Sequence, residues 1–466
     1  MSILEVSATI RTAPDDRSDT ELPSGADPTL RPLFAKVVRG ERLTIEDGLT
    51  LYSTPDLWSV CAMADRVRRR LHGLATYYNI NRHLNYSNVC ALSCKFCEFY
   101  RKEGGEGAYT RDMAYVRDET ARAVEAGATE MHCVGGLHPK LPFEYYPELI
   151  RTIRATATSR GSDLHIKAFT AVEIVHLARV ARVFKQSDRV AGIRWVLEQL
   201  RESGLGSLPG GGAEVFDDRV HDEAYKGKIR SDVWLDVHRV AHDIGLNTNA
   251  TMLYGHIESR HDRLVHLDML RRAQDRALVR LGYEGVEPNR AEPRADTGAE
   301  VGHPGYAGDE GNDVPTVTLT REGVALPAPR MNKRGGYYQT IIPLPFFPDG
   351  SELEHLPGPT GLENLRTLAI ARLMLDNFPH VKAFWIMQTL PMAQLMLHCG
   401  ADDLDGTVVW YDITKVGGAS THQEVSVRTL KKTIRDAGFI PVERDTLYRR
   451  IERDARDGKA WRVATE

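Results

Sequence analysis

The 466-residue sequence contains little cysteine and no long apolar run. Six cysteines are too few for a disulfide framework in a chain of this length, which excludes the small disulfide-rich secreted class. No segment approaches the roughly 18 apolar residues that are needed to cross a bilayer. Residues 1–25 also lack the basic and apolar regions of a secretory signal. We therefore expect a cytoplasmic protein that has no membrane partner.

An excess of charge of either sign is also missing. The 60 Lys and Arg residues face 64 Asp and Glu residues, and the formal net charge is −4. This balance provides no bulk attraction to nucleic acid or to an anionic membrane, and we expect neither as a partner. The content of 42% hydrophobic and 27% charged residues is typical of globular proteins, and the length allows one large domain or two.

Two segments are poor in large apolar residues. Residues 1–28 are rich in Ser, Thr, Asp and Pro, and residues 284–336 are rich in Gly, Pro and acidic residues. Neither segment can bury enough apolar surface to offset the entropy of ordering, so we expect a disordered tail and a disordered insertion. Residues 29–76 carry apolar residues at helical spacing and predict an N-terminal helical segment. The main domain is then predicted to start with residues 77–283 and to be completed by residues 337–466.

Short β-prone runs alternate with amphipathic helical stretches throughout this main domain. The alternation recurs roughly eight times, which predicts parallel strands joined by helical crossovers. We expect an α/β protein with a TIM-type (β/α)8 barrel, preceded by the helical extension and interrupted by the insertion. A doubly wound open sheet is the alternative, but the number of repeats favours the barrel. C-terminal helices should follow, the last at about residues 445–458. The expected strands are 79–89, 130–136, 163–169, 207–214, 248–255, 340–347, 382–387 and 407–412.

Three of the cysteines lie together in a C-x3-C-x2-C motif, directly after the first predicted barrel strand. The thiolates of Cys90, Cys94 and Cys97 can hold three irons of a [4Fe–4S] cluster. The fourth iron then remains open to a small chelating ligand, and the amino and carboxylate groups of S-adenosylmethionine (SAM) suit that position. The motif therefore predicts a [4Fe–4S] cluster and SAM as cofactors at the C-terminal mouth of the barrel.

A non-catalytic zinc or iron–sulfur protein is the alternative from another class. A structural zinc site normally needs four ligands, often as two paired knuckles. Cys133 lies in a β-prone run and Cys399 near a helix end, so neither forms a second knuckle. A ferredoxin cluster needs a fourth cysteine in register, and none is present near the motif.

Several residues near the predicted mouth are candidates for cofactor binding. Phe96 precedes the last cysteine of the motif and could shield the cluster or pack near the adenine, although loop packing explains it equally well. Gly135 and Gly136 end the second strand, where glycine permits close approach of a ligand or simply a turn. Glu214 follows a run of three glycines and is a candidate for hydrogen bonds to ribose hydroxyls. Its alternative is an acidic residue near a helix N-terminus.

Polar residues at other strand ends are candidates for substrate binding and catalysis. Lys167 lies in an otherwise apolar strand, and a buried lysine needs an anionic partner such as a substrate carboxylate. Each such residue, taken singly, is more often a structural polar group whose hydrogen bonds are satisfied. The predicted catalytic residues are Lys167, His138 and Glu173, and the predicted substrate-binding residues are Arg82, Lys167, Asn249, Tyr254 and His256.

Four segments resemble the aminofutalosine synthases, radical SAM enzymes of the futalosine route to menaquinone. They are NRHLNYSNVCALSCKFCEFYR, HCVGGLHPKLPFEYY, LPGGGAEVF and ATMLYGHIE. The resemblance covers residues 35–280 and 337–460, whereas the insertion departs from the family pattern. The words HCVGGLHP and CEFYR separate this chain from the cyclic dehypoxanthine futalosine synthases and the deazaflavin-forming synthases, which share GGGAE and the ATM-YGH word.

The resemblance implies a transferase reaction. A 5′-deoxyadenosyl radical adds to the enol-ether double bond of 3-[(1-carboxyvinyl)oxy]benzoate, and the adduct rearranges and loses its carboxylate carbon. The products are 6-amino-6-deoxyfutalosine, methionine and bicarbonate. The resemblance thus implies a small-molecule substrate with two carboxylates and a reducing partner such as flavodoxin or ferredoxin. Lys167, His138 and Arg82 are the candidates for binding the carboxylates. The alternative is a cyclic dehypoxanthine futalosine synthase, which abstracts hydrogen and releases 5′-deoxyadenosine.

Overall fold

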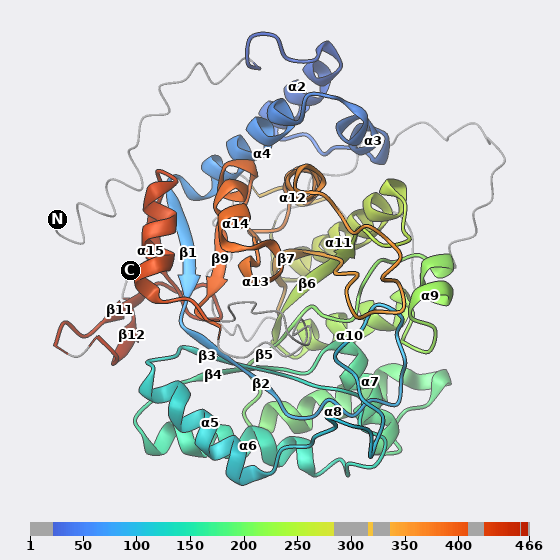
Figure 1. Cartoon of the computed structure of the whole chain (residues 1–466), viewed down its shortest axis with the longest axis vertical. Helices are drawn as coiled ribbons and strands as arrows, with labels where there is room; N and C mark the ends of the chain where they lie inside the picture. Colours follow the sequence, from blue (N-terminus) through green and yellow to red (C-terminus); the bar gives the residue numbers. More distant parts are fainter. Residues whose placement is uncertain (1–21, 284–315, 320–335, 409–423, 457, 465–466) are drawn as a thin grey trace.

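Three helices form the N-terminal extension, as the sequence predicts. They are α2 (Arg31–Arg39), α3 (Ile45–Ser53) and α4 (Leu57–His72), and a short 3-10 helix, η1 (Pro28–Leu30), precedes them. The computed structural model describes residues 22–283, 316–319, 336–408, 424–456 and 458–464 (Figure 1).

Local capping signals begin the helices of this extension. Thr44 and Asp47 form a reciprocal capping box at α3, and the Asp56 carboxylate accepts the Ser59 N–H at the start of α4. The buried face of α4 packs against α12 (Gly361–Met374) and against the 3-10 helix η3 (Leu397–Cys399). The extension is therefore joined to the main domain.

Seven parallel strands form the main sheet, in the order β2-β3-β4-β5-β6-β7-β8. Helices pack on its outer surface (Figure 1). The strands are β2 (Asn81–Asn85), β3 (Glu130–Val134), β4 (His165–Ala168), β5 (Ser207–Leu208), β6 (Asn247–Tyr254), β7 (Tyr338–Pro345) and β8 (His380–Val381). The helices of this part are α5 (Met113–Glu125), α6 (Tyr145–Ser159), α7 (Ala171–Val180), η2 (Gln186–Asp188), α8 (Arg189–Glu202), α9 (Asp218–Ala224), α10 (Ser231–Asp243), α11 (Arg260–Arg280), α13 (Trp385–Gln388) and α14 (Leu390–Met396).

A further strand, β9 (Asp403–Gly406), takes the eighth position. A parallel bridge joins Asp403 to Lys382 just after β8, and β9 also pairs with β1 (Ala75–Asn79), which leads directly into β2. On the β2 side, the Val408 N–H donates to the Asn81 side chain at 2.8 Å. The predicted TIM-type α/β fold is confirmed, with seven strands in one sheet and β9 at the point of closure.

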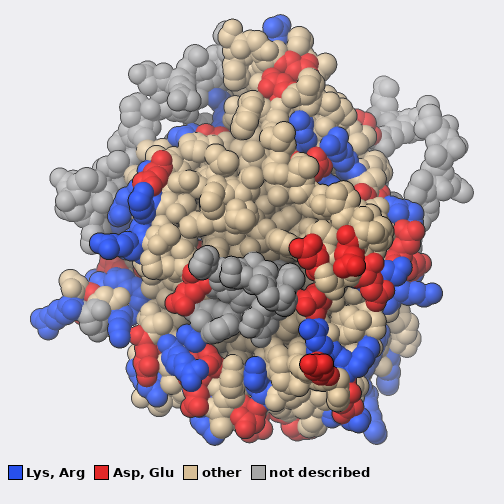
Figure 2. Space-filling view, in the orientation of Figure 1, with Lys and Arg blue, Asp and Glu red and all other residues tan. Residues whose placement is uncertain are grey.

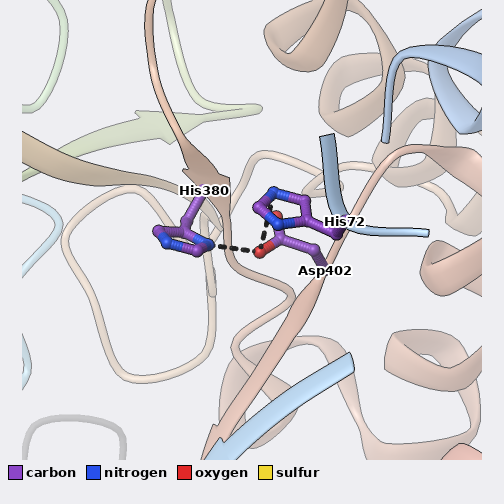
Figure 3. A group of neighbouring side chains, drawn as sticks. All are labelled: His72, His380 and Asp402. Atoms are coloured by element: carbon purple, nitrogen blue, oxygen red, sulfur yellow. Dashed lines mark hydrogen bonds and ion pairs between the residues drawn. The ribbon is translucent and has the colours of Figure 1, made fainter. Parts of the chain in front are cut away.

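The Asp402 carboxylate holds β8 and β9 together (Figure 3). Its Oδ1 accepts the Val381 N–H at 2.8 Å and a guanidinium N–H of Arg372. Its Oδ2 lies 2.5 Å from Nδ1 of His380 and 3.5 Å from Nε2 of His72. Burial lowers the pKa of His72 to about 3, so this imidazole is neutral at pH 7. These three side chains could together hold a metal ion, but the Arg372 guanidinium beside Asp402 already supplies the positive charge.

The C-terminal region differs from the prediction. Helix α15 (Val427–Asp436) is present, and β10 (Ile440–Glu443) pairs with β1. The helix expected at residues 445–458 is wrong, because the chain forms an antiparallel hairpin of β11 (Ile451–Arg453) and β12 (Trp461–Val463). The Asp445 carboxylate accepts the backbone N–H groups of Leu447 and Arg449, and Tyr448 has φ 59°. This turn is incompatible with the helix that was predicted for the segment.

Two of the expected strands are also misplaced. Helix α13 (Trp385–Gln388) overlaps the second half of the run that was predicted as the strand 382–387. The run predicted at 407–412 begins after β9, and residues 409–412 lie outside the described part of the chain. Apolar runs of this length do not distinguish a strand from a buried helix by periodicity, which explains the first error.

Parts of both segments that we expected to be disordered are packed. In the predicted tail, the Thr54 hydroxyl donates to Asp27 at 2.5 Å and the Asp27 N–H donates to Asp56 at 3.0 Å. In the predicted insertion, Val317 and Leu319 are buried against α11, and the Val317 N–H donates to Asp275 at 2.9 Å. Residues 1–21, 284–315 and 320–335 lie outside the described residues.

Basic and acidic side chains are intermixed on the face shown in Figure 2. The broadest uncharged area of this face lies over α12 and α14, which carry the exposed Leu362 and Leu395. None of the described helices is long and apolar enough to span a bilayer.

Buried neutral histidines predict a loss of stability in acid. His238 stacks on Trp234 at 3.7 Å, and burial lowers its pKa to about 3. Because the folded pKa lies below the unfolded value of about 6.5, the unfolded chain binds more protons below that pH, and stability falls as pH falls. For His238 alone this loss is about 2 kcal/mol at pH 5.

We expect the Tm to be steady from pH 8 to pH 7 and to fall between pH 6.5 and pH 5. His238→Phe keeps the stacked ring and removes the titrating group, so its Tm should fall less over the same interval. Thermal unfolding followed by circular dichroism at each pH measures both slopes. Equal slopes for the variant and the parent chain would contradict this assignment.

Candidate active site

A cavity of about 300 Å³ lies inside the barrel, at the C-terminal ends of its strands. Its wall combines the cysteine motif, glycine-rich strand ends and side chains that point inward from the sheet. The predicted site residues that line it are Cys90, Cys94, Phe96, Cys97, Gly135, Gly136, Lys167, Glu173, Glu214 and Asn249.

Backbone hydrogen bonds fix the loop that carries the cysteine motif. The Cys90 N–H donates to the Arg101 carbonyl at 3.0 Å, and the Ala91 N–H donates to the Leu137 carbonyl at 2.9 Å. The Cys97 N–H donates to the Cys94 carbonyl at 3.0 Å, which closes a turn within the motif. Burial raises the pKa of the Cys94 thiol to about 11. The three cysteines line one cavity, and these backbone hydrogen bonds hold their loop in a defined conformation.

The two glycines after β3 pack directly against the chain that leads into this loop. A Cβ atom on Gly136 would lie 2.3 Å from the Val89 carbonyl oxygen, and one on Gly135 would lie 2.8 Å from that of Ser87. The Gly136 N–H donates to the Ser87 carbonyl at 2.8 Å. The close approach that requires glycine here is an approach to the chain's own backbone, next to Cys90.

Glu173 holds the same region together. Its Oε1 accepts the Tyr86 hydroxyl at 2.7 Å and the Gly135 N–H at 3.0 Å, and its Oε2 accepts the N–H and hydroxyl of Thr170, each at 2.7 Å. Burial raises the pKa of Glu173, and these donors oppose the rise. With four hydrogen bonds inside the protein, this carboxylate serves to position the glycine turn, and its predicted catalytic role gains no support.

Glu214 and Lys228 form an ion pair near the cysteines. Lys228 follows α9, and its Nζ lies 4.9 Å from the centroid of the Phe96 ring. Glu214 has φ 48°, in the left-handed region that residues other than glycine seldom adopt. The sequence analysis did not single out Lys228, because it lies in a loop between helices and belongs to no motif.

Four predicted residues do not line the cavity. Arg82 pairs with Glu119 of α5 at 3.0 Å, on the outer face of the sheet. His138 accepts the N–H groups of Lys140 and Leu141 through Nδ1, each at 3.1 Å. Both residues have partners within the protein, and their roles in substrate binding stay predictions.

The other two lie at the end of β6 and directly after it. The Tyr254 hydroxyl donates to Asn364 at 2.9 Å and accepts from Gln388 at 3.0 Å. His256 lies 3.4 Å from Glu258, and its Nε2 lies 3.2 Å from the Leu253 carbonyl oxygen. Strand ends alone therefore did not reveal which side chains point inward.

The sequence analysis also missed residues that line the deep end of the cavity: His132, Lys382 and Asp405. His83, which is next to Arg82 in β2, lines it as well. Period-two alternation in β2 and β3 would have identified the two histidines, since Arg82 and His83 face opposite sides of one strand. Lys382 and Asp405 had no such signal, because they follow or belong to strands of very few residues.

Comparison with known proteins agrees with this geometry. The Radical SAM superfamily profile matches residues 84–270, and the CofH/MqnC C-terminal region profile matches residues 335–456. The aminodeoxyfutalosine synthase of Thermus thermophilus is 38% identical over 91% of this chain and 96% of that protein. The chain belongs to the aminodeoxyfutalosine synthase family.

Other comparisons support the same family and the fold. The Streptomyces coelicolor aminodeoxyfutalosine synthase is 37% identical over 90% of this chain and 93% of that protein. The crystal structure of methylornithine synthase superposes with a TM-score of 0.58 at 15% identity, covering 88% of this chain and 97% of that one. At this identity the superposition shows the barrel fold alone.

Membership in this radical SAM family identifies the cofactors as a [4Fe–4S] cluster and SAM. The described residues fit them. Cys133 is buried in β3 outside the cavity, and Cys399 lies at the end of η3 next to α4, so no fourth thiol among the described residues lines the cavity. Three thiols leave one iron of the cluster without a protein thiolate, as SAM binding requires.

The packing of Gly136 predicts that a methyl group there disturbs the cysteine loop. In Gly136→Ala the Cβ must push against the Val89 carbonyl, directly before Cys90, so we expect less than half of the parental iron content after anaerobic reconstitution. Cys94→Ala should lose the cluster. Iron and sulfide analysis with the absorbance near 400 nm measures both.

Gly361→Ala is the matched control, because its Cβ would meet only the terminal methyl of Met392. It should bind iron like the parent chain. A full complement of iron in Gly136→Ala would show that the loop tolerates the shift and would contradict the expectation.

Proposed function

We propose that this chain transfers the 5′-deoxyadenosyl group of SAM to 3-[(1-carboxyvinyl)oxy]benzoate and forms 6-amino-6-deoxyfutalosine for menaquinone biosynthesis. The observation that carries the proposal is one barrel cavity with the cysteine motif at its mouth and polar side chains at its deep end, in a chain of this family. The cluster and SAM supply a 5′-deoxyadenosyl radical when they are bound.

The residues at the mouth are proposed to hold the cofactors. Cys90, Cys94 and Cys97 bind the cluster, and the cavity wall around them supplies Phe96 and Glu214 for the adenine and the ribose. Lys228 fixes the Glu214 carboxylate and places a positive charge beside the thiolates. Gly135 and Gly136 bring backbone close to the same wall.

Much of the cavity wall is apolar. Val134, Leu253, Leu344, Phe346 and Phe384 are among the residues that line it. A radical that adds to a double bond must be kept from solvent, and an apolar wall reduces the contact with water. The same wall suits the aromatic ring of the substrate.

The substrate and the reductant follow from this reaction. A radical SAM enzyme needs a small-molecule substrate and a source of electrons, and we propose a dicarboxylate for the first and flavodoxin or ferredoxin for the second. The cytoplasmic location stays a prediction from the sequence.

Product analysis tests the proposal. With SAM deuterated at both C5′ positions, reductant and the enol-ether benzoate, we expect an adenine-containing adduct that retains both deuterium atoms, and one methionine for each adduct. Addition through C5′ breaks no C5′–H bond, so both labels must survive. Liquid chromatography with mass spectrometry separates the products.

A hydrogen-abstracting enzyme gives a different result. Free 5′-deoxyadenosine without an adduct would contradict the proposal and favour the related cyclase reaction. Cys94→Ala is the control in both cases, since it should produce neither compound.

A further inference from the structure

The deep end of the cavity is a polar floor made of Lys167, Lys382, Asp405, His132 and Asn249, and it is built from strands that are distant in sequence. His132 of β3 and Lys167 of β4 are paired residues in the sheet register, so both project inward at the same level. Lys382 and Asp405 reach this level from the segment after β8 and from β9. No other part of the cavity wall places two lysines beside a histidine among the described residues.

Carboxylates fix both lysines of the polar floor in place. The Lys167 Nζ lies 2.6 Å from Oε1 of Glu130, and the Lys382 Nζ lies 2.9 Å from Oδ1 of Asp405. All four side chains are buried. An ammonium group has three N–H donors, and each of these ion pairs occupies one of them. The lysines therefore present further donors at fixed positions next to the cavity.

His132 adds an unused polar atom. Its Nε2 is buried and has no hydrogen-bond partner among the described residues. Burial and the nearby Lys167 lower the pKa of His132, so the imidazole is neutral. A buried polar atom without a partner is unfavourable, and a bound ligand that supplies the partner removes this cost.

The proposed function requires one orientation of the substrate in this cavity. The double bond that accepts the adenosyl carbon must face the mouth, where the cysteines lie. The carboxylate on that double bond then stays near the mouth, and the aromatic ring lies against apolar side chains of the wall such as Leu344 and Phe384. The benzoate carboxylate, on the other side of the ring, points to the polar floor.

We propose that Lys382 and His132, together with Lys167, bind the benzoate carboxylate of the substrate. This inference rests on the proposed function and deepens it by naming the residues that select an aromatic carboxylate. Asp405 and Glu130 act as positioning residues, because they hold the two ammonium groups. Recognition of this carboxylate distinguishes the substrate from a phenyl ether that lacks it.

Binding measurements with two ligands test the assignment. One ligand is 3-[(1-carboxyvinyl)oxy]benzoate, and the other is 2-phenoxyacrylate, which lacks only the benzoate carboxylate. Dissociation constants are measured anaerobically by calorimetry on the reconstituted enzyme with SAM and without reductant. The parent enzyme should bind the benzoate about 10–100-fold more tightly than the phenyl ether.

Lys382→Met should lose most of that preference. Its Kd for the benzoate should rise by about 10-fold or more, while its Kd for 2-phenoxyacrylate stays within about twofold of the parent value. Lys382→Arg should retain the preference in large part. Lys185→Met removes an exposed lysine far from the cavity wall and should behave like the parent enzyme.

Loss of folding is controlled separately. Lys382→Met removes the nearer cation of the buried Asp405, which keeps the Arg444 guanidinium at 3.9 Å, so Lys382→Met combined with Asp405→Asn removes the Lys382–Asp405 pair together. Iron content and SAM affinity equal to the parent values show that either variant is folded. The folded variant must then lose the preference for the benzoate.

Two results would overturn the inference. One is equal weakening of both ligands in the folded variant, and the other is a parent enzyme that does not prefer the benzoate. Adduct formation by the parent enzyme in either case leaves the proposed function standing. Failure of the parent enzyme to form the adduct contradicts the proposed function instead.

Discussion

The barrel closes where β9 lies between β8 and β1, and the contacts of the Asp402 carboxylate hold it there. This buried group accepts from Arg372, His380 and the Val381 backbone at once. Loss of one partner from a buried pair of this kind typically costs about 3–5 kcal/mol, because the other charge stays buried. Arg372 reaches Asp402 from α12, so the outer helices and the inner strands are joined at the same point.

The closure also determines what lines the cavity. Asp403 and Asp405 follow Asp402 on β9, and Asp405 meets Lys382 only because β9 lies beside the segment after β8. Arg444, which follows β10, pairs with Asp403. An open sheet would leave these charges in water and would give no polar floor. The contacts of Asp402 thus support the polar floor that lies next to them.

The two ends of the cavity carry different groups of polar side chains. Its mouth carries the three thiols with the Glu214–Lys228 pair, and its floor carries the lysines with their carboxylates. Each end has its own charged groups, and apolar side chains make up much of the remaining wall. A substrate with an aromatic ring between two carboxylates matches this combination of polar and apolar surface.

Local signals in the sequence predicted the barrel, most of its helices and the cysteine end of the site. Helices such as α5 and α10 follow from apolar spacing, and the spacing of Cys90, Cys94 and Cys97 defines their chemistry without any distant residue. The errors fall where tertiary contacts decide. Arg82 was chosen over its neighbour His83, which faces the cavity, and the segment 445–458 forms a turn and a hairpin.

The sequence by itself thus determined the cofactor chemistry and the family, since both follow from motifs of contiguous residues. The tertiary structure alone decided which polar residues share the cavity with those cofactors. Lys167 and Lys382 lie on opposite sides of the insertion in the chain, and only closure of the sheet brings them to one floor. The physical reason is that a strand directs alternate side chains to opposite faces, and its neighbours depend on register and closure rather than on local sequence.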